Sequence, residues 1–247
     1  MAASQLDFSV ALVLGIAPAL AVLYWSVRRY DVPFTRYRLF DDRRLFGGLA
    51  VGLIFGVLAA FVEVNAPAGF AGTVIALAAF FVFEESFKMV WLNRKSYRGR
   101  FDTTFYGVSI GVGIAAALAV ASVLGNVSTS STSLYTPQSL LLLALFSSSW
   151  SLVHADTGVL IGFGASRGET LWPFVKAVLV RLAHGMLLLA FFLGIEEPWS
   201  LLAVATSIAF AALVYHYVYS VLLPGTLPDD IRKDMQREKR RARRAKA

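Results

Sequence analysis

Two adjacent glutamates and a lysine lie inside an otherwise apolar stretch, residues 80–91, and could carry the chemistry of this protein. An ionised group at the centre of a membrane helix costs roughly 2.5–3.5 kcal/mol, so charged residues there usually mark a site or a specific contact. Glu84 and Lys88 are four residues apart, and we expect them to pair on one helical face. Glu85 points about 100° away from Glu84, which leaves one carboxylate for another partner.

Two histidines further along the chain can join these carboxylates. Counting inward along expected spanning helices at about 1.5 Å per residue, Glu84, His154 and His184 lie roughly 12, 16 and 18 Å from the cytoplasmic ends. Their similar depth predicts one shared pocket. Two carboxylates and two imidazoles are the groups that a water-activating hydrolase needs, because they supply a general base and donors for the developing oxyanion.

The same groups also fit other roles. A buried pair of opposite charges can serve only to lock helices together, and a buried histidine can make an interhelical hydrogen bond worth about 0.6–2 kcal/mol. A divalent metal is the weaker alternative because few further oxygen ligands are close, so we predict neither a metal nor a cofactor.

Two further ionisable residues lie in the expected spans. Asp156 faces roughly the opposite side of its helix from His154, and Lys176 and Arg181 are its candidate partners. His216 has no acidic neighbour at its depth, and we interpret it as a packing residue.

The composition indicates an integral membrane protein. Of the 247 residues, 57% are hydrophobic and 16% are charged, and the mean hydropathy is +0.64. We expect an all-α bundle of seven transmembrane helices in one domain (1–227), followed by a polybasic cytoplasmic tail (228–247). The expected helices cover residues 8–27, 45–64, 70–92, 104–125, 140–165, 172–195 and 199–223. The absence of cysteine excludes disulfides, thiolate nucleophiles and cysteine metal sites.

Basic residues lie on one side of the expected bundle only. The three inner loops and the tail hold six, four, one and nine Lys and Arg residues, whereas the opposite connections hold none. The positive-inside rule therefore predicts an N-terminus outside and a C-terminus in the cytoplasm. This orientation requires an odd number of spans.

Small residues recur at four-residue spacing on two of the expected helices. They are Gly48, Gly52 and Gly56 on one, and Gly107, Gly111 and Ala115 on the other. Such stripes let helices approach closely, either within the chain or in contact with other membrane proteins. For the first stripe we favour packing within the chain.

The polybasic tail is expected to bind anionic lipid at the surface of the bilayer, at about 1 kcal/mol per basic residue. Ribosomal RNA is the less favoured alternative. Because the tail has no interleaved aromatic residues on which bases could stack, any contact with RNA would be to phosphate and sensitive to salt.

The ordered motifs resemble those of a known superfamily. Residues 84–88, Glu-Glu-Ser-Phe-Lys, look like the Glu-Glu-x-x-Lys/Arg signature of the PrsW and CAAX-endopeptidase (CPBP) superfamily of glutamate-dependent intramembrane proteases. The similarity continues through residues 101–107, 111–115, 154–158, 162 and 181–184. In an active member, Glu84 or Glu85 would activate water, His154 and His184 would orient it or stabilise the oxyanion, and Lys88 would set the carboxylate charge.

Two departures bring the chain closer to a second branch of this superfamily. The proteases carry a Glu or His motif on the fourth helix, where this chain has Ile114 and Leu118, and often Asp or Asn at the position of Leu188. The chain is also similar to the anterior-pharynx-defective scaffold subunit of γ-secretase, and more distantly to the seven-helix partner of nicalin at the translocon. That similarity includes the N-outside arrangement and residues 15–20 and 198–199.

These resemblances imply a non-proteolytic scaffold or assembly subunit for other membrane proteins, in the plasma membrane of a prokaryote. Its polar core would consist of Glu84, Glu85, Lys88, His154 and His184. The alternative is an intramembrane endopeptidase that uses the same residues. Ion or proton transport is a third class, which the sequence disfavours because it contains no inverted repeat and no pair of broken helices.

Overall fold

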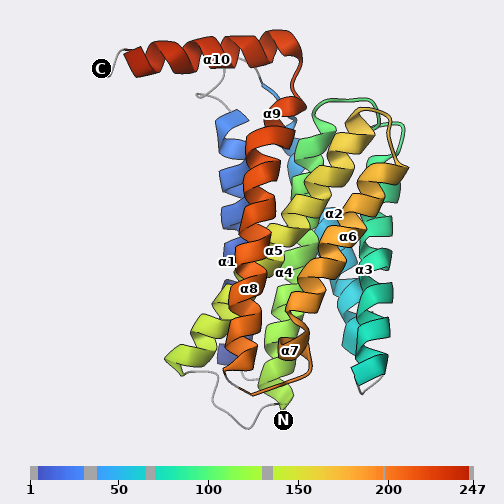
Figure 1. Cartoon of the computed structure of the whole chain (residues 1–247), viewed down its shortest axis with the longest axis vertical. Helices are drawn as coiled ribbons and strands as arrows, with labels where there is room; N and C mark the ends of the chain where they lie inside the picture. Colours follow the sequence, from blue (N-terminus) through green and yellow to red (C-terminus); the bar gives the residue numbers. More distant parts are fainter. Residues whose placement is uncertain (1–4, 31–37, 65–69, 130–135, 197, 245–247) are drawn as a thin grey trace.

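The computed structural model describes residues 5–30, 38–64, 70–129, 136–196 and 198–244, which form helices and no β-strand. The long helices run along the axis of one bundle (Figure 1). They are α1 (Gln5–Val27), α2 (Asp42–Val64), α3 (Phe70–Leu92), α4 (Thr103–Thr129), α5 (Pro137–Ser166), α6 (Leu171–Leu187) and α8 (Trp199–Tyr217). Shorter elements are η1 (Arg28–Tyr30), α7 (Leu189–Phe192), the π-helix η2 (Val218–Leu222), α9 (Leu223–Gly225) and α10 (Asp229–Arg244).

In the described part of the chain, five helices are long and apolar enough to cross a membrane, which indicates an integral membrane protein. These segments cover residues 8–30, 42–61, 103–125, 137–166 and 199–225. Helix α3 falls outside this set because it carries Glu84, Glu85 and Lys88, and α6 falls outside because it has 17 residues. Both nevertheless lie in the same bundle as the apolar helices (Figure 1).

The predicted single helix over residues 172–195 is interrupted at Leu188 and ends at Phe192. Helix α6 ends at Leu187, the four-residue α7 follows, and a Schellman turn closes α7 with Gly194 at φ +62°. The break brings the ring of Phe191 to 4.7 Å from Phe146 and the ring of Phe192 to 5.7 Å from Trp150, between ring centroids. Aromatic packing against α5 therefore accompanies the break.

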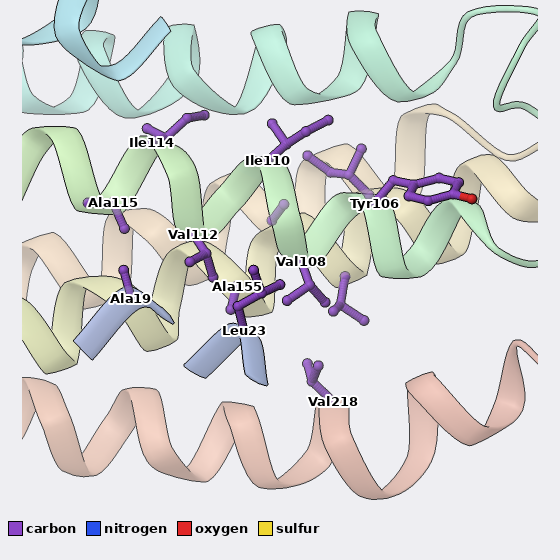
Figure 2. Packing of buried hydrophobic residues seen from close by; sticks show 14 of the residues in the cluster. Ala19, Leu23, Tyr106, Val108, Ile110, Val112, Ile114, Ala115, Ala155 and Val218 are labelled. Carbon is purple, nitrogen blue, oxygen red and sulfur yellow. The ribbon is translucent and has the colours of Figure 1, made fainter. Parts of the chain in front are cut away.

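Helix α4 is the central element of the bundle and packs against α1, α2 and α5. A side chain at Gly52 or Gly56 of α2 would collide with the backbone of α4, and one at Gly107 or Gly111 of α4 would collide with the backbone of α5. The prediction that the α2 stripe packs within the chain is confirmed. Figure 2 shows the apolar side chains of α4, including Val108 and Val112, beside those of α1 and α5.

Helix α5 has a defined beginning. The side chain of Thr136 accepts a hydrogen bond from the backbone N–H of Ser139 (3.2 Å), and Pro137 occupies the first turn, where its missing N–H costs nothing. The helix then continues for 30 residues to Ser166. This length carries His154 and Thr157 to the centre of the bundle.

The connection between α3 and α4 is fixed by an ion-pair network. Arg100 donates two hydrogen bonds to the carboxylate of Asp102 (3.0 and 2.7 Å), and these bonds raise the pKa of the Arg100 guanidinium. The hydroxyl of Tyr106 donates to the same carboxylate (2.9 Å) and accepts from the backbone N–H of Asp41 (3.0 Å). The network therefore links the beginnings of α2 and α4.

The polybasic tail is helical. Helix α10 lies across the end of the bundle, roughly perpendicular to the long helices (Figure 1). Ile231 and Met235 pack against the hydrophobic core, and Lys233 and Arg237 are exposed. Residues 245–247 lie outside the described chain.

Candidate functional site: a buried ion-paired core

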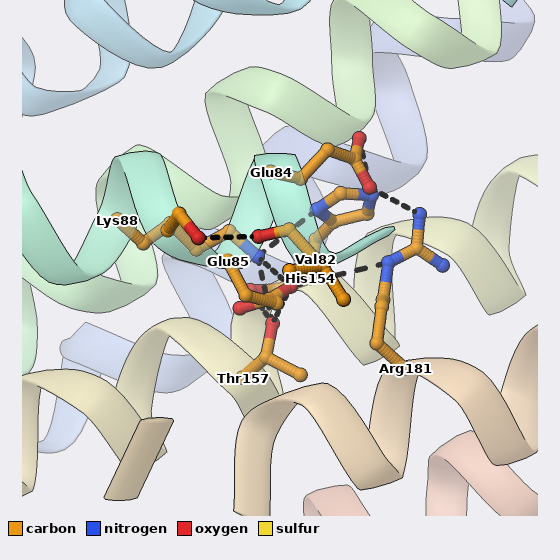
Figure 3. Close-up of polar contacts among 8 residues, drawn as sticks. Val82, Glu84, Glu85, Lys88, His154, Thr157 and Arg181 are labelled. Carbon is orange, nitrogen blue, oxygen red and sulfur yellow. Dashed lines mark hydrogen bonds and ion pairs between the residues drawn. The ribbon is translucent and has the colours of Figure 1, made fainter. Parts of the chain in front are cut away.

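The candidate site lies where α3, α5 and α6 meet (Figure 3). Helix α3 supplies Glu84, Glu85 and Lys88, helix α5 supplies His154 and Thr157, and helix α6 supplies Arg181. Each of these six side chains is fully buried, with 0% of its surface exposed. Burial of charge is tolerated only when ion pairs and hydrogen bonds replace water, so the contacts among these residues determine what the site can do.

Glu85 is the partner of Lys88. The ammonium Nζ of Lys88 lies 2.7 Å from Glu85 Oε1 and 2.7 Å from Thr157 Oγ1. The Thr157 hydroxyl in turn donates to Glu85 Oε1 (3.0 Å). The predicted pairing of Glu84 with Lys88 is therefore wrong. Glu85, three residues before Lys88, also accepts a hydrogen bond from Thr157 of α5, whereas Glu84 turns toward α6.

Glu84 pairs instead with Arg181. Arg181 Nη2 donates to Glu84 Oε2 at 2.9 Å, and Arg181 Nε lies 4.0 Å from Glu85 Oε1. The guanidinium lies over the rings of Phe81 and Trp150, at 4.3 and 4.1 Å from their centroids. These cation–π contacts stabilise a desolvated cation and fix its orientation toward α3.

Arg181 was not among the predicted site residues, although its place within an expected span could have indicated it. Gly185 lies one turn further along α6, and a side chain at this position would collide with the ring of Phe81. A single arginine thus neutralises one carboxylate and approaches the other.

The protonation of His154 follows from its partners. Lys88 Nζ lies 3.2 Å from His154 Nδ1, and an ammonium group can only donate, so Nδ1 is the acceptor. We therefore assign the neutral tautomer with the proton on Nε2. This nitrogen faces Glu84 Oε1 at 3.8 Å, and neither atom has a hydrogen-bond partner among the described residues.

His184 belongs to a separate hydrogen-bonded chain. Ser207 Oγ donates to the carbonyl of Val204 (2.8 Å), so Ser149 Oγ donates to Ser207 (3.0 Å) and accepts from His184 Nε2 (2.8 Å). The indole of Trp150 lies beside both histidines, with its centroid 5.6 Å from His154 and 5.8 Å from His184. The expected shared pocket is therefore divided, because His184 bonds toward α8 while His154 faces the carboxylates.

Two expectations for neighbouring residues are also wrong. Asp156 pairs with neither candidate cation: Arg181 is committed to Glu84, and Lys176 is exposed. Both carboxylate oxygens of Asp156 are buried without a hydrogen-bond partner. His216 lies on the exposed face of α8.

The positions at which the sequence departs from the proteases contribute no polar group to the site. Ile114 and Leu118 of α4 are fully buried, and the backbone of Ile114 lies against Gly56 of α2. Leu188 is fully buried at the break between α6 and α7.

The surroundings of the site are apolar. An apolar cavity of about 30 Å³ lies between α3, α6 and α7, and Phe81, Gly185 and Met186 are among its lining residues. Phe81 lies between this cavity and the guanidinium of Arg181, which its ring covers. Within the described part of the chain, no group of three or more His, Asp or Glu side chains is placed to hold a metal ion.

Comparison with known proteins found no match: no family model, no curated protein and no solved structure is significantly similar to the chain. The similarity to the PrsW and CAAX-endopeptidase superfamily therefore remains a prediction from the motifs.

Proposed function

We propose that this protein is a non-proteolytic scaffold or assembly subunit for other membrane proteins. The observation that carries the proposal is the pairing of both glutamates with buried cations, Glu84 with Arg181 and Glu85 with Lys88. The Glu84–Arg181 pair joins α3 to α6, and Thr157 joins the Glu85–Lys88 pair of α3 to α5. A structural role then accounts for the charged residues, because they form a polar core that fixes the position of α3.

The chemistry of hydrolysis supports the same choice. A general base must lie within hydrogen-bond distance of the water whose proton it takes, and that water must reach a peptide carbonyl carbon, yet Glu84, Glu85 and both histidines are fully buried. The apolar cavity between α3, α6 and α7 is lined by Phe81, whose ring covers the guanidinium of Arg181, and no carboxylate lines it. An extended peptide would require α3 or α6 to move.

We further propose that α3 and α6 cross the membrane with the five more apolar helices, which gives seven spans with the N-terminus outside. The charges of α3 are paired inside the bundle, so they need not meet lipid. The positive-inside distribution supports this orientation. The prokaryotic plasma membrane is proposed from the resemblance alone.

For partners, we propose other membrane proteins in the bilayer plane and anionic lipid at α10. The glycine stripes of α2 and α4 are occupied within the chain, so a partner would contact outer faces such as that around Ile54 and Ile75. Exposed Lys233 and Arg237 on α10 favour contact with lipid headgroups. Ribosomal RNA remains the alternative for this helix.

A glutamate-dependent endopeptidase is the second candidate, and one observation favours it. Glu84 Oε1 and His154 Nε2 face each other at 3.8 Å, and neither atom has a hydrogen-bond partner in the described part of the chain. A carboxylate acceptor and an imidazole donor at this spacing could hold a water molecule between them, which is the arrangement a water-activating site needs.

Affinity purification from native membranes tests the choice. The wild type is compared with a Glu84→Gln/Glu85→Gln variant, with exposed Glu169→Gln as the control. A scaffold retains a stoichiometric protein partner in the wild type and the control, and the double variant, which leaves Lys88 and Arg181 buried and unpaired, loses this partner without accumulating uncut membrane proteins. Uncut membrane proteins trapped by the double variant alone would establish the protease instead.

A further inference from the structure

A second buried polar region lies between α1, α5 and α8 and is not used by the proposed scaffold core. Its central residue is Asp156 of α5, whose side chain is fully buried. Neither of its carboxylate oxygens has a hydrogen-bond partner among the described residues. An isolated carboxylate in such a place is too costly to remain ionised, so it must acquire a positive charge or a proton.

The packing of α5 on α8 places Tyr215 at the level of Asp156. Ser149 bonds Ser207 near one end of the contact, and Phe163 meets Gly225 near the other. On α5, Asp156 lies midway along the sequence between Ser149 and Phe163. In the chain segment that packs against α5, Tyr215 lies between Ser207 and Gly225. Seven residues separate Ser149 from Asp156, which puts both on the same face of α5, and Asp156 interacts electrostatically with Tyr215.

Two hydroxyl groups at this level, those of Ser26 and Tyr215, have their hydrogens in other bonds, whereas the hydroxyl of Tyr219 is buried without a hydrogen-bond partner among the described residues. Ser26 of α1 donates its hydrogen to the carbonyl of Val22 (2.7 Å). In the 2.9 Å contact between Ser26 and Tyr215, the tyrosine is therefore the donor. Both hydrogens are thus used away from Asp156. The remaining lone pairs suit a cation and not an anion.

The charge balance of the core also lacks one positive charge. Among the described residues, three carboxyl groups have no exposed surface, those of Glu84, Glu85 and Asp156, and two cations have none, Lys88 and Arg181. Lys88 is the charged residue whose electrostatic field reaches Asp156, but its three N–H groups are directed to Glu85, Thr157 and His154. His154 is neutral because its Nδ1 accepts from the Lys88 ammonium, and His184 bonds Ser149 and no carboxylate among the described residues.

We propose that Asp156 is a buried binding site for one monovalent cation, either a proton or a sodium ion. Bound there, the cation neutralises the third carboxyl group of the core. Lys88 from α3 and Tyr215 from α8 interact electrostatically with Asp156. Ser26 from α1 bonds the hydroxyl of Tyr215, and Tyr219 from η2 stacks on Tyr215 with 5.6 Å between ring centroids. The π-helix η2 begins three residues after Tyr215, and π turns are frequent at functional sites.

Infrared spectroscopy and thermal unfolding of the full chain in lipid nanodiscs distinguish the two cations. The samples are the wild type, Asp156→Asn, and Asp102→Asn as a control carboxylate that is paired with Arg100. If the cation is a proton, the wild type and the control show the carbonyl stretch of a protonated carboxyl group at neutral pH, and Asp156→Asn loses it. Labelling aspartate with ¹³C shifts the same band in the wild-type chain, so the assignment does not depend on the variant folding.

If the cation is sodium, the wild type and the control unfold at a higher temperature in sodium chloride than in choline chloride at equal ionic strength. The Asp156→Asn variant then loses this difference, and wild-type unfolding follows a saturable sodium titration. The proposal is overturned if the wild type shows neither an aspartic acid band nor a sodium-dependent shift of its unfolding temperature.

Discussion

At the scale of single residues, the choice of ion-pair partners defines the core. The i, i+3 and i, i+4 neighbours of a lysine are both reachable on a helix, so sequence spacing alone leaves Glu84 and Glu85 as equal candidates. Contacts from other helices determine which glutamate pairs with Lys88, because Thr157 of α5 donates to Glu85 and Arg181 of α6 donates to Glu84. The burial of all five predicted site residues follows from their apolar context, but their partners depend on tertiary packing.

Replacing Lys88 by methionine should destabilise the protein by about 3–5 kcal/mol, because it leaves the Glu85 carboxylate buried and unpaired. Exposed Lys95, in the loop after α3, provides the matched control. Reversible unfolding in mild detergent measures both variants. Equal stability of Lys88→Met and Lys95→Met would show that the ion pair does not hold α3.

The hydrogen-bonded chain of His184 can be tested on one of its serines. Ser149→Ala removes the group that links His184 to Ser207 and should cost about 1 kcal/mol, the usual worth of an interhelical hydrogen bond in a membrane protein. The neighbouring Ser148 bonds only the carbonyl of Ala144 in its own helix, so Ser148→Ala should be close to neutral. A larger loss for Ser148→Ala, measured in the same unfolding assay, would contradict the assignment.

At the scale of elements, close approach of α4 to α2 and α5 explains the small residues. Their four-residue spacing is visible in the sequence, and it correctly predicts tight packing. The break at Leu188 is not visible, because no proline or glycine stands there and the break coincides with stacking of Phe191 on Phe146. Tertiary aromatic contacts cannot be inferred from a local pattern.

Gly111→Ala should destabilise the bundle by about 1–3 kcal/mol, since the added methyl group would collide with the carbonyl oxygen of His154. The collision would also displace His154 from Lys88. Gly47→Ala on α2 is the control, because no atom lies within 4 Å of its added methyl group. Thermal unfolding should therefore shift downward for Gly111→Ala and remain unchanged or rise slightly for Gly47→Ala.

At the scale of the whole molecule, the class of protein can be predicted from composition, and five apolar helices agree with it. The number of spans is harder to predict because α3 is charged and α6 is short. Whether such helices cross the membrane depends on ion pairs and neighbours rather than on their own hydropathy.

Single cysteines in this cysteine-free chain test the orientation. With seven spans and an outside N-terminus, Gln138→Cys in the first turn of α5 is labelled by an impermeant maleimide in intact cells, and Ser96→Cys after α3 is labelled only after permeabilisation. If α3 and α6 did not cross, these two positions would exchange sides. The reversed labelling pattern would therefore contradict the seven-span arrangement.

The central claim is that the buried charges stabilise a scaffold instead of performing catalysis. Removing both partners of one ion pair tests this claim most directly, because an apolar pair of similar volume can replace a structural ion pair but not a catalytic one. Methionine suits both positions, since a thioether packs well between aromatic rings such as those of Phe81 and Trp150.

The measurement is the unfolding temperature and the set of co-purifying membrane proteins for Glu84→Met, Arg181→Met and the double variant. A scaffold predicts that each single variant loses stability and partners, and that the double variant recovers both. A double variant that unfolds at the wild-type temperature, yet loses its partners or accumulates uncut membrane proteins, would contradict the structural role of the pair.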